Sequence, residues 1–481
     1  MNTPLLRNYI NGAWIEAVTG TVAEQRAPAD LTVVTCRFQQ SGREDARAAI
    51  AAAEGALGSW SARPASQRAE VLGRAQAVLA RRQEEIAETI TRENGKTLAE
   101  SRTEVVAALK ELDWQIAEGR RLFGEVVPSE RDGVFAYSIR QPLGVVSVIS
   151  PWNFPLNVVC RKCAPALMGG NTVVLKPASL TPRTAACFVE ALAEAGLPPG
   201  VINFVTGPGS TVGDELVVNP AIRAISFTGS TPVGMGIHQK AAATLARTQL
   251  EMGGKNPAVV LADADVEAAA EAVVLAAYAC AGQWCTSTSR AIVEADVYHR
   301  FQREVLKRVA RIKVGNGLDP SSTMGPVCGE QQARDIMGYI ETGIGEGASL
   351  VAGGHRIGNG GCFVEPTVFG GVTPNMTIAR EEIFGPVLCL MKVAGFDEAV
   401  RVANNIGFGL SSSVFTASLE KALRFVEATD VGLTHVNMPT AYKEPQLSFG
   451  GIKQSGVGLP EAGRTGIEFF TRHKTVYIKY R

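Results

Sequence analysis

From Leu143 onward, short apolar runs alternate with stretches of helical periodicity. Short runs rich in Val and Ile, separated by helical segments, are typical of parallel strands joined by crossover helices. The pattern therefore predicts an α/β protein with two successive parallel sheets. The first sheet is predicted from GVVSVIS, TVVLK, VINFVTG and AIRAISF within residues 144–227, and the second from PAVVLA, RAIVE and PVLCLMKV within residues 257–393.

The segment before these runs has a different periodicity. Residues 43–122 are rich in Ala, Glu, Arg and Leu at three-to-four spacing, which predicts packing helices. Their charged positions are interpreted as solvated faces without a chemical role, among them Glu84, Glu85, Arg102 and Glu104.

Three further segments alternate apolar and polar residues. Asn8 to Trp14 predicts a hairpin that turns at Asn11-Gly12, a favoured type I′ pair. Residues 123–141 predict a strand pair, and the tail at residues 469–480 predicts another strand. Neither of these two segments is flanked by crossover helices, so we expect each to pair with a strand that is distant in sequence.

Length and charge limit the classes of function. A chain of 481 residues exceeds one core and indicates about three domains at ~150 residues each. Lys plus Arg and Asp plus Glu both number 47, so no basic face is predicted and nucleic acid is not an expected partner. No apolar run approaches the ~18 residues of a membrane span, so no membrane partner is expected either.

The nine cysteines are an odd number without framework spacing, which predicts free thiols in a reducing compartment. Cys160 and Cys163 form a lone CxxC in a helical context with no second pair, so we predict no metal site. The first residues lack a basic segment followed by an apolar one. The expected location is therefore the cytoplasm.

One cysteine is a candidate nucleophile. A helical run at about residues 266–280, with Asp265 as its N-cap, predicts that Cys285 lies on the loop that follows. A free thiol with a pKa near ~8.5 needs polar neighbours to become a thiolate, and the run TSTS after Cys285 supplies them. Most cysteines of intracellular enzymes are small buried hydrophobes, so the segment alone does not assign catalysis.

Six motifs in order add a resemblance that covers nearly the whole chain. They are PWNFP at residues 151–155, KPAS at 176–179, FTGSTPVG at 227–234, LEMGGKNP at 250–257, GQWCTSTSR at 282–290 and EEIFGPV at 381–387. In this order and spacing they resemble the aldehyde dehydrogenase superfamily, and the motifs are most similar to those of succinate-semialdehyde and α-ketoglutarate-semialdehyde dehydrogenases.

The resemblance implies a domain organisation. A Rossmann-type dinucleotide-binding domain would comprise residues 1–122 and 143–253, and an α/β catalytic domain residues 254–453. A small β oligomerisation element would comprise residues 123–142 and 466–481. The expected assembly is a homodimer or homotetramer.

The resemblance also implies the chemistry. Cys285 would add to an aldehyde carbonyl, and the resulting thiohemiacetal would give up a hydride and collapse to a thioester. Asn153 matches the oxyanion-hole amide, Glu251 matches the general base that activates water, and Lys162 fits a lysine of a proton relay. Many members continue Gly-Arg-Glu after SGxG, whereas here Gly458 is followed by Leu459 and Pro460, so we predict that the relay glutamate is missing.

For the cofactor, the sequence has no GxGxxG fingerprint and no P-loop lysine after GSTPVG, which excludes an ATPase reading. The loop GPGSTVG offers Gly209 and Gly213, and Ser230 opens a helix whose N-terminus suits a pyrophosphate. NAD-specific members often carry Glu at the position of Ser179, where a carboxylate would repel a 2′-phosphate, so we expect NADP as well as NAD to bind. The resemblance implies further contacts at Trp152, Lys176, Phe227, Glu382 and Phe384.

For the substrate, Arg161 matches an arginine that holds a distal carboxylate in succinate-semialdehyde dehydrogenases, and Trp284 is expected to narrow the tunnel. A carboxylated semialdehyde is therefore the predicted substrate. An aromatic or plain aliphatic aldehyde remains an alternative, because some aromatic-aldehyde members also carry this arginine. A non-catalytic scaffold that keeps the fold is a further alternative, and a CoA-acylating relative is disfavoured because those tend to lack the base.

Overall fold

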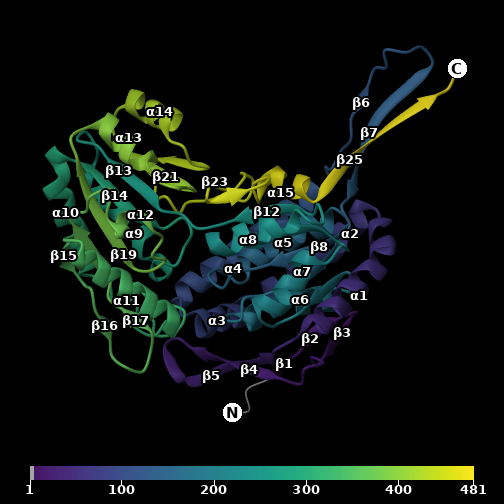
Figure 1. The fold of residues 1–481 in the computed structure, drawn as a ribbon, viewed down its shortest axis with the longest axis horizontal. Coiled ribbons are helices and arrows are strands. Elements are labelled where there is room, and N and C mark those ends of the chain that lie inside the picture. The colour runs from purple at the N-terminus through teal and green to yellow at the C-terminus, as the bar shows by residue number, and fades with distance from the viewer. Residues whose placement is uncertain (1–4) are drawn as a thin grey trace.

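The first series of predicted strands forms the centre of an eight-stranded sheet (Figure 1). The computed structural model describes residues 5–481. In it the five central strands of this sheet, which lie within residues 145–251, run parallel, and all four predicted runs are confirmed. The sheet order is β24 (Gly456–Val457), β12 (Arg247–Glu251), β11 (Ile222–Thr228), β8 (Val145–Ile149), β9 (Thr172–Lys176), β10 (Ile202–Phe204), β2 (Asn8–Ile10) and β3 (Ala13–Ile15).

The edge of this sheet contains the predicted hairpin. β2 and β3 pair antiparallel, and Asn11 and Gly12 between them have φ angles of 51° and 83°. Both values are those of a type I′ turn, which confirms the prediction. Two further N-terminal strands, β4 (Val22–Ala27) and β5 (Asp30–Gln39), form a separate three-stranded sheet with β1 (Leu5–Leu6).

Helices pack against the eight-stranded sheet and supply most of its core. The predicted helical region at residues 43–122 is confirmed as four helices. These are α1 (Arg43–Ser61), α2 (Ala65–Arg81), α3 (Gln83–Asn94) and α4 (Leu98–Gly119), and the crossovers between strands hold α5 (Asn157–Met168), α6 (Pro182–Glu194), α7 (Asp214–Val218) and α8 (Thr231–Ala241).

The assignment of Glu104 to a solvated face is wrong. Its side chain is buried, contacts Lys96 with Oε2 2.6 Å from Nζ, and accepts hydrogen bonds from the backbone N–H groups of Leu156 and Asn157. Glu104 therefore caps the start of α5, the helix that carries Arg161. Glu104 was assigned to a solvated face because it is charged. A carboxylate can nevertheless be buried where it contacts a cation and accepts hydrogen bonds from the free N–H groups of a helix N-terminus.

The second series of predicted strands forms a seven-stranded sheet, as expected. All strands except β15 run parallel to their neighbours. The order is β15 (Ser349–Ala352), β18 (Thr367–Gly370), β19 (Val387–Val393), β14 (Thr288–Glu294), β13 (Asn256–Val260), β21 (Ser411–Phe415) and β22 (Leu433–Val436), and the helices around it are α9 (Val266–Tyr278), α10 (Ala295–Val309), α11 (Glu330–Gly345), α12 (Thr377–Arg380), α13 (Phe396–Asn404) and α14 (Leu419–Ala428). Two separate two-stranded sheets are also present. One pairs β16 (Arg356–Ile357) with β17 (Phe363–Val364), and the other pairs β20 (Phe408–Gly409) with β23 (Ile452–Lys453).

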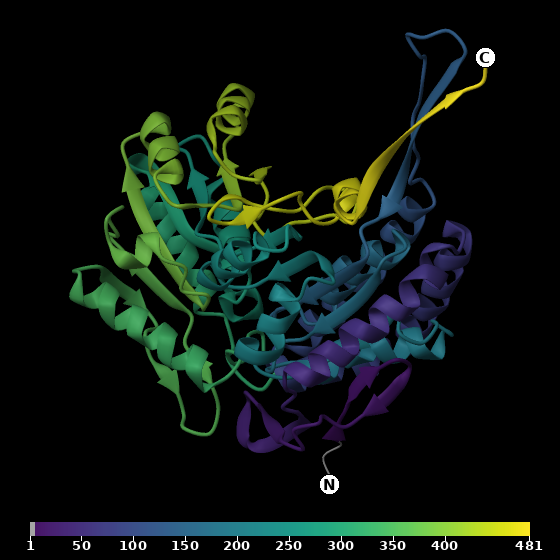
Figure 2. The same ribbon diagram turned by 45° about the vertical axis from the view of Figure 1, so that its right-hand side comes forward.

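A β arm projects from the body of the protein (Figures 1 and 2). It consists of β6 (Val126–Val127), β7 (Val134–Pro142) and β25 (Thr471–Lys479), and β25 follows α15 (Gly463–Phe469). The two segments predicted to pair with distant strands pair with each other, from Val134 with Lys479 to Pro142 with Thr471. Among the helices within residues 5–481, none is both long and apolar enough to span a bilayer.

Candidate active site

The loop that carries Cys285 is shaped by an unusual turn. α9 begins after Asp265, whose side chain accepts a hydrogen bond from the backbone N–H of Ala268, so the predicted N-cap is confirmed. After α9, the turn at residues 279–282 holds Cys280 and Ala281 at left-handed φ angles of 53° and 55°. This turn reverses the chain, and Cys285 lies just beyond it, before β14.

The turn needs a glycine at its end. Gly282 has a φ of 69°, and a Cβ atom there would lie 2.1 Å from the carbonyl oxygen of Gly385. No other residue fits so close to that backbone. The glycine thus lets the segment that precedes β19 pack directly against the Cys285 loop.

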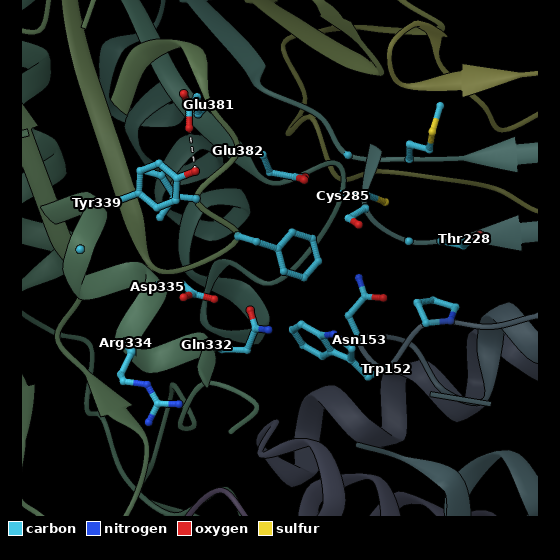
Figure 3. A pocket seen from close by; sticks show the side chains of 18 of the residues that line it. Trp152, Asn153, Thr228, Cys285, Gln332, Arg334, Asp335, Tyr339, Glu381 and Glu382 are labelled. Carbon is cyan, nitrogen blue, oxygen red and sulfur yellow. Dashed lines mark hydrogen bonds between the residues drawn. The ribbon is translucent and has the colours of Figure 1, made fainter. Parts of the chain in front are cut away.

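Two cavities meet at Cys285. The Phe384 cavity, of about 780 Å³, lies between the two sheets, and Figure 3 shows the Asn153 side chain in it, pointing toward the Cys285 segment. The Arg161 cavity, of about 580 Å³, lies on the α4 and α5 side. Asn153, Thr228, Glu251 and Cys285 line both cavities. A reactant in either cavity therefore reaches the same thiol, carboxylate and amide.

The thiol and the carboxylate influence each other. Burial raises the pKa of the Cys285 thiol well above its ordinary value, and Glu251 raises it further. Burial also raises the pKa of Glu251 to about 7, with Glu461 adding to the effect. The two groups are close enough to affect each other's pKa, although no hydrogen bond of regular geometry joins them. Glu251 can therefore accept and release a proton near neutrality.

Asn153 lies in the loop between β8 and α5. Its side-chain N–H donates to the carbonyl oxygen of Gln283 at 3.2 Å, two residues before Cys285. Asn94 steadies the same loop by donating to the carbonyl oxygen of Trp152 at 2.9 Å. An amide nitrogen carries two hydrogens, so Asn153 keeps one donor for a ligand oxygen beside the thiol.

The prediction of a missing glutamate is wrong. Glu461, which follows Gly458 by three positions instead of two, is buried beside Lys162 and Arg161, and its carboxylate contacts both cations. Burial alone would raise the pKa of Glu461, but Lys162 and Arg161 outweigh it, and the pKa falls below its usual range. Glu461 thus lies outside the expected motif in sequence, although its carboxylate contacts Lys162.

Lys162 is fully buried and joins this group to the sheet. Its ammonium contacts Glu461 and donates to Ser226 Oγ at 3.0 Å. Burial lowers the pKa of Lys162, and Glu461 only partly offsets that effect. Thr228 Oγ1 also donates to Glu461 Oε1 at 3.3 Å, and Thr228 lines both cavities. The predicted lysine thus contacts Glu461, and Thr228 joins the same carboxylate to the wall of both cavities.

Arg161 is buried and lines the cavity named after it. Its Nε lies 2.9 Å from Glu461 Oε2, and the guanidinium lies 4.6 Å from the centre of the Phe449 ring. Within residues 5–481, neither terminal nitrogen of Arg161 donates a hydrogen bond. Trp284 lines the same cavity, where its ring lies 4.9 Å from that of Phe154.

Several predicted cofactor residues surround the Phe384 cavity. The rings of Trp152 and Phe384 meet edge to face at 5.3 Å, and Ser230 lies at the start of α8 on the same wall. Glu382 accepts a hydrogen bond from the backbone N–H of Gly254 at 2.9 Å, and burial raises its pKa to about 7. A Cβ on Gly253 would lie 2.0 Å from Glu382 Oε2, so the glycine leaves room for this carboxylate at the cavity wall.

The remaining predicted residues lie apart from that cavity. Lys176 ends β9, and Gly213, in a helical turn at residues 209–213 that also contains Gly209, approaches its side chain closely. Burial lowers the pKa of the Lys176 ammonium to about 8. Ser179, three positions later, is exposed. The ring of Phe227 is buried beneath Gly229 and supports the loop rather than lining the cavity.

These residues fit a dinucleotide. The carboxyl ends of the parallel strands lie near the N-terminus of α8. Gly253 leaves room for the carboxylate of Glu382, and the ammonium of Lys176 is buried without an ion pair within residues 5–481. A dinucleotide carries hydroxyl, amide and phosphate groups that can form hydrogen bonds with these side chains and with the helix N-terminus. The geometry therefore supplies a place for a cofactor on one side of the thiol and for a substrate on the other.

Comparison with known proteins agrees with this arrangement. The aldehyde dehydrogenase family model matches residues 14–476. Over 476 residues the chain is 44% identical to an α-ketoglutaric semialdehyde dehydrogenase of Bacillus subtilis, covering 98% of both chains. It is 41% identical to an α-ketoglutarate semialdehyde dehydrogenase of Haloferax volcanii, covering 98% of this chain and 99% of that one.

Solved structures show the same fold. A structure described as an NADP dependent enzyme of E. coli superposes with a TM-score of 0.96 at 35% identity, covering 98% of both chains. A structure of an NAD-dependent aldehyde dehydrogenase from Sinorhizobium meliloti superposes with a TM-score of 0.97 at 35% identity, covering 99% of this chain and 95% of that one. Match and fold both extend over nearly the entire length, and the chain belongs to the aldehyde dehydrogenase family.

Proposed function

We propose that this enzyme oxidises a carboxylated semialdehyde, such as α-ketoglutarate or succinate semialdehyde, to the corresponding acid with NADP or NAD. The observation that carries the proposal is the junction at Cys285, where one cavity suits a dinucleotide and the other ends in a buried arginine with free donors. The names of the relatives from Bacillus subtilis and Haloferax volcanii support the same substrate class.

The chain's own residues have the following proposed roles. Glu251 takes the proton of the Cys285 thiol, and the thiolate adds to the aldehyde carbon to form a thiohemiacetal. Asn153 and the backbone N–H of Cys285 stabilise the oxyanion, and loss of one such donor typically costs about 2.7–4 kcal/mol of barrier. A bound nicotinamide would accept the hydride. Glu251 then removes a proton from the water that attacks the thioester.

Proton release is proposed to use the buried pair next to Glu251. Lys162 and Glu461 are in contact, and Glu461 raises the pKa of Glu251. A proton accepted by Glu251 near pH 7 therefore has a neighbouring chain of ionisable groups through which it can leave.

Arg161 is proposed to bind the distal carboxylate of the substrate. Its Nε lies in ion-pair contact with Glu461, and the two terminal nitrogens remain free to bind a carboxylate in bidentate geometry. Trp284 and Phe154 are proposed to form the apolar wall along the substrate's carbon chain.

Lys176 and Ser179 are proposed to bind the adenosine ribose. An exposed serine at this position does not repel a 2′-phosphate, which supports use of NADP as well as NAD. The E. coli neighbour is described as NADP dependent and that of Sinorhizobium meliloti as NAD-dependent, so the fold accommodates either cofactor among relatives.

The assembly and location are also proposals. Exposed apolar residues on the arm, including Val126, Phe135 and Tyr477, support a homodimer or homotetramer in which the arm contacts a partner subunit. All nine cysteines are free, which supports a reducing compartment and hence the cytoplasm.

The test is a substrate panel with both cofactors, followed by the absorbance of the reduced nicotinamide. We expect semialdehydes with a distal carboxylate to have the highest kcat/KM, and Cys285→Ser to abolish oxidation of every aldehyde. Arg161→Ala should raise KM about tenfold or more for succinate semialdehyde and little for benzaldehyde. Preference for benzaldehyde or pentanal in the wild-type enzyme would instead support the aromatic or aliphatic alternative, and no turnover at all would support a scaffold.

A further inference from the structure

A second cation with a largely covered side chain lines the Arg161 cavity. Lys443 belongs to the loop at residues 437–451, between β22 and β23, and this loop forms one wall of the Arg161 cavity. The lysine side chain is only 18% exposed. The proposed chemistry gives it no role, and a buried ammonium is costly unless something in the cavity stabilises it.

Lys443 and Arg161 both lie close to one aromatic ring. The Lys443 ammonium lies 5.6 Å from the centre of the Phe449 ring, and the Arg161 guanidinium lies 4.6 Å from the same centre. Glu461 acts on both cations, since it pairs with Arg161 and favours the charged form of Lys443. The two donors therefore occupy the same end of the cavity.

The protein compensates this end only in part. Lys443 contacts the carboxylate of Glu111. The carboxylate of Glu461 forms ion pairs with both Arg161 and Lys162. These three cations therefore contact two carboxylates, those of Glu111 and Glu461. Burial lowers the pKa of Lys443 to about 7, and Glu461 offsets that effect only in part. An additional anion at this end would complete the balance.

We propose, on the basis of the proposed function, that Lys443 is a specificity-determining residue that donates to the 2-oxo oxygen of a 2-oxo acid semialdehyde while Arg161 holds its carboxylate. The end group of such a substrate presents three oxygens, and a guanidinium fork binds two of them. The third oxygen needs a separate donor from another direction. Lys443 supplies a flexible ammonium with three N–H groups beside the arginine.

The test compares three aldehydes of equal chain length. α-Ketoglutarate semialdehyde carries a carboxylate and a 2-oxo group, glutarate semialdehyde carries only the carboxylate, and pentanal carries neither. The quantities measured are kcat/KM and KM for each aldehyde with the full-length enzyme and a fixed cofactor. The ratio of kcat/KM between the first two aldehydes reports the 2-oxo group alone.

We expect Lys443→Met to lower that ratio about tenfold, mainly through KM, and to leave oxidation of pentanal unchanged. Lys443→Arg keeps a cationic donor and should restore part of the ratio. Lys110→Met removes an exposed lysine that lines the same cavity and should affect both anionic aldehydes equally. A uniform loss for all three aldehydes in Lys443→Met would overturn the proposal and indicate a structural role.

Removal of Lys443 leaves Glu111 buried without its cation, so folding needs its own control. The double variant Lys443→Met/Glu111→Gln contains no such unpaired carboxylate and should show the same lowered ratio with a thermal unfolding midpoint near that of the wild type. A wild-type enzyme that does not distinguish the two anionic aldehydes overturns the role of Lys443 and leaves the proposed function intact. A wild-type enzyme that prefers pentanal overturns both.

Discussion

The two cavities that meet at Cys285 differ in how the protein treats buried charge. On the side where the cofactor is proposed to bind, Glu382 at the Phe384 cavity and Lys176 outside it have no ion pair within residues 5–481, and burial shifts the pKa of Glu382 to about 7 and that of Lys176 to about 8. Lys255 behind Glu382 is buried in the same way, and its ammonium has no hydrogen-bond partner within residues 5–481. On the substrate side, buried charges occur in contacting pairs, namely Lys96 with Glu104, Lys162 with Glu461 and Lys443 with Glu111.

We relate this difference in buried charge to the ligand proposed for each side, a dinucleotide on one and a small aldehyde on the other. A charge without a partner is costly when buried, so it is best placed where a large ligand arrives and completes its hydrogen bonds. A paired charge is held in one geometry before any ligand binds, which suits the positioning of a small aldehyde. The Phe384 side is thus proposed to gain its partners from the cofactor, whereas on the Arg161 side contacting pairs hold the charges before the substrate adds its own anion.

The sharpest way to break the comparison is at Glu251, which belongs to both cavities. Glu251→Gln keeps the size of the side chain and removes the proposed base of both the thiol and the water, so we expect one slowed burst of reduced cofactor, no larger than the number of active sites, followed by a stalled thioester. Steady turnover should fall by about 10²–10⁴-fold. Stopped-flow absorbance measures the burst, and mass spectrometry of the stalled enzyme measures the acyl group. Undiminished steady turnover would remove Glu251 from its proposed role.

The pairing on the substrate side is tested at Glu461. Because Glu461 raises the pKa of Glu251 while Lys162 and Arg161 lower it, Glu461→Gln should lower the pKa of Glu251. Oxidation requires the deprotonated base, so the rate of the wild type should rise with pH through about 7, and the variant's rise should lie about one unit lower. A pH profile of kcat measures the shift.

The control for this variant is Glu104→Gln, which also deprives a buried lysine of its carboxylate. Each variant leaves a buried cation unpaired, and loss of about 3–5 kcal/mol of stability is expected for both. Glu461→Gln should move the pH profile more than Glu104→Gln, because Glu461 is a main cause of the raised pKa of Glu251 and Glu104 is not. Equal profiles in the two variants would contradict the proposed coupling.

The cofactor side is tested by the smallest change, at the exposed Ser179. Ser179→Glu places a carboxylate where the 2′-phosphate of NADP is proposed to lie. Two like charges at about 4 Å repel by about 1 kcal/mol in water, so KM for NADP should rise about fivefold to tenfold, with KM for NAD nearly unchanged. Ser179→Ala is the matched control and should affect both cofactors little. An unchanged KM for NADP in Ser179→Glu would place the phosphate elsewhere.

Sequence reasoning succeeded where the signal was local. Both parallel sheets, the Asn11-Gly12 hairpin and the Asp265 N-cap follow from short-range periodicity and turn chemistry, and the structure confirms them. The motifs that carry Cys285 and Asn153 are equally local, and the structure brings these residues to one junction.

The ion pairs between buried residues far apart in sequence could not be predicted from local patterns. Glu461 lies 299 positions from Lys162, and one additional residue hid it from motif matching. Glu104 looked like a surface carboxylate because helical periodicity does not tell which polar residue meets a buried cation. Lys443 lies on an irregular loop without periodicity, so only the assembled cavity reveals its neighbours.

The left-handed turn before Cys285 has a consequence for the evolution and engineering of heat resistance. Each non-glycine residue in that conformation costs roughly 1–2 kcal/mol, and Cys280 and Ala281 adopt it in succession. The net stability of a folded domain is only about 5–15 kcal/mol, so this turn consumes a substantial share of it. Selection for survival at high temperature alone should therefore favour glycine at these two positions, and the gain would come with a nucleophile that is held less firmly.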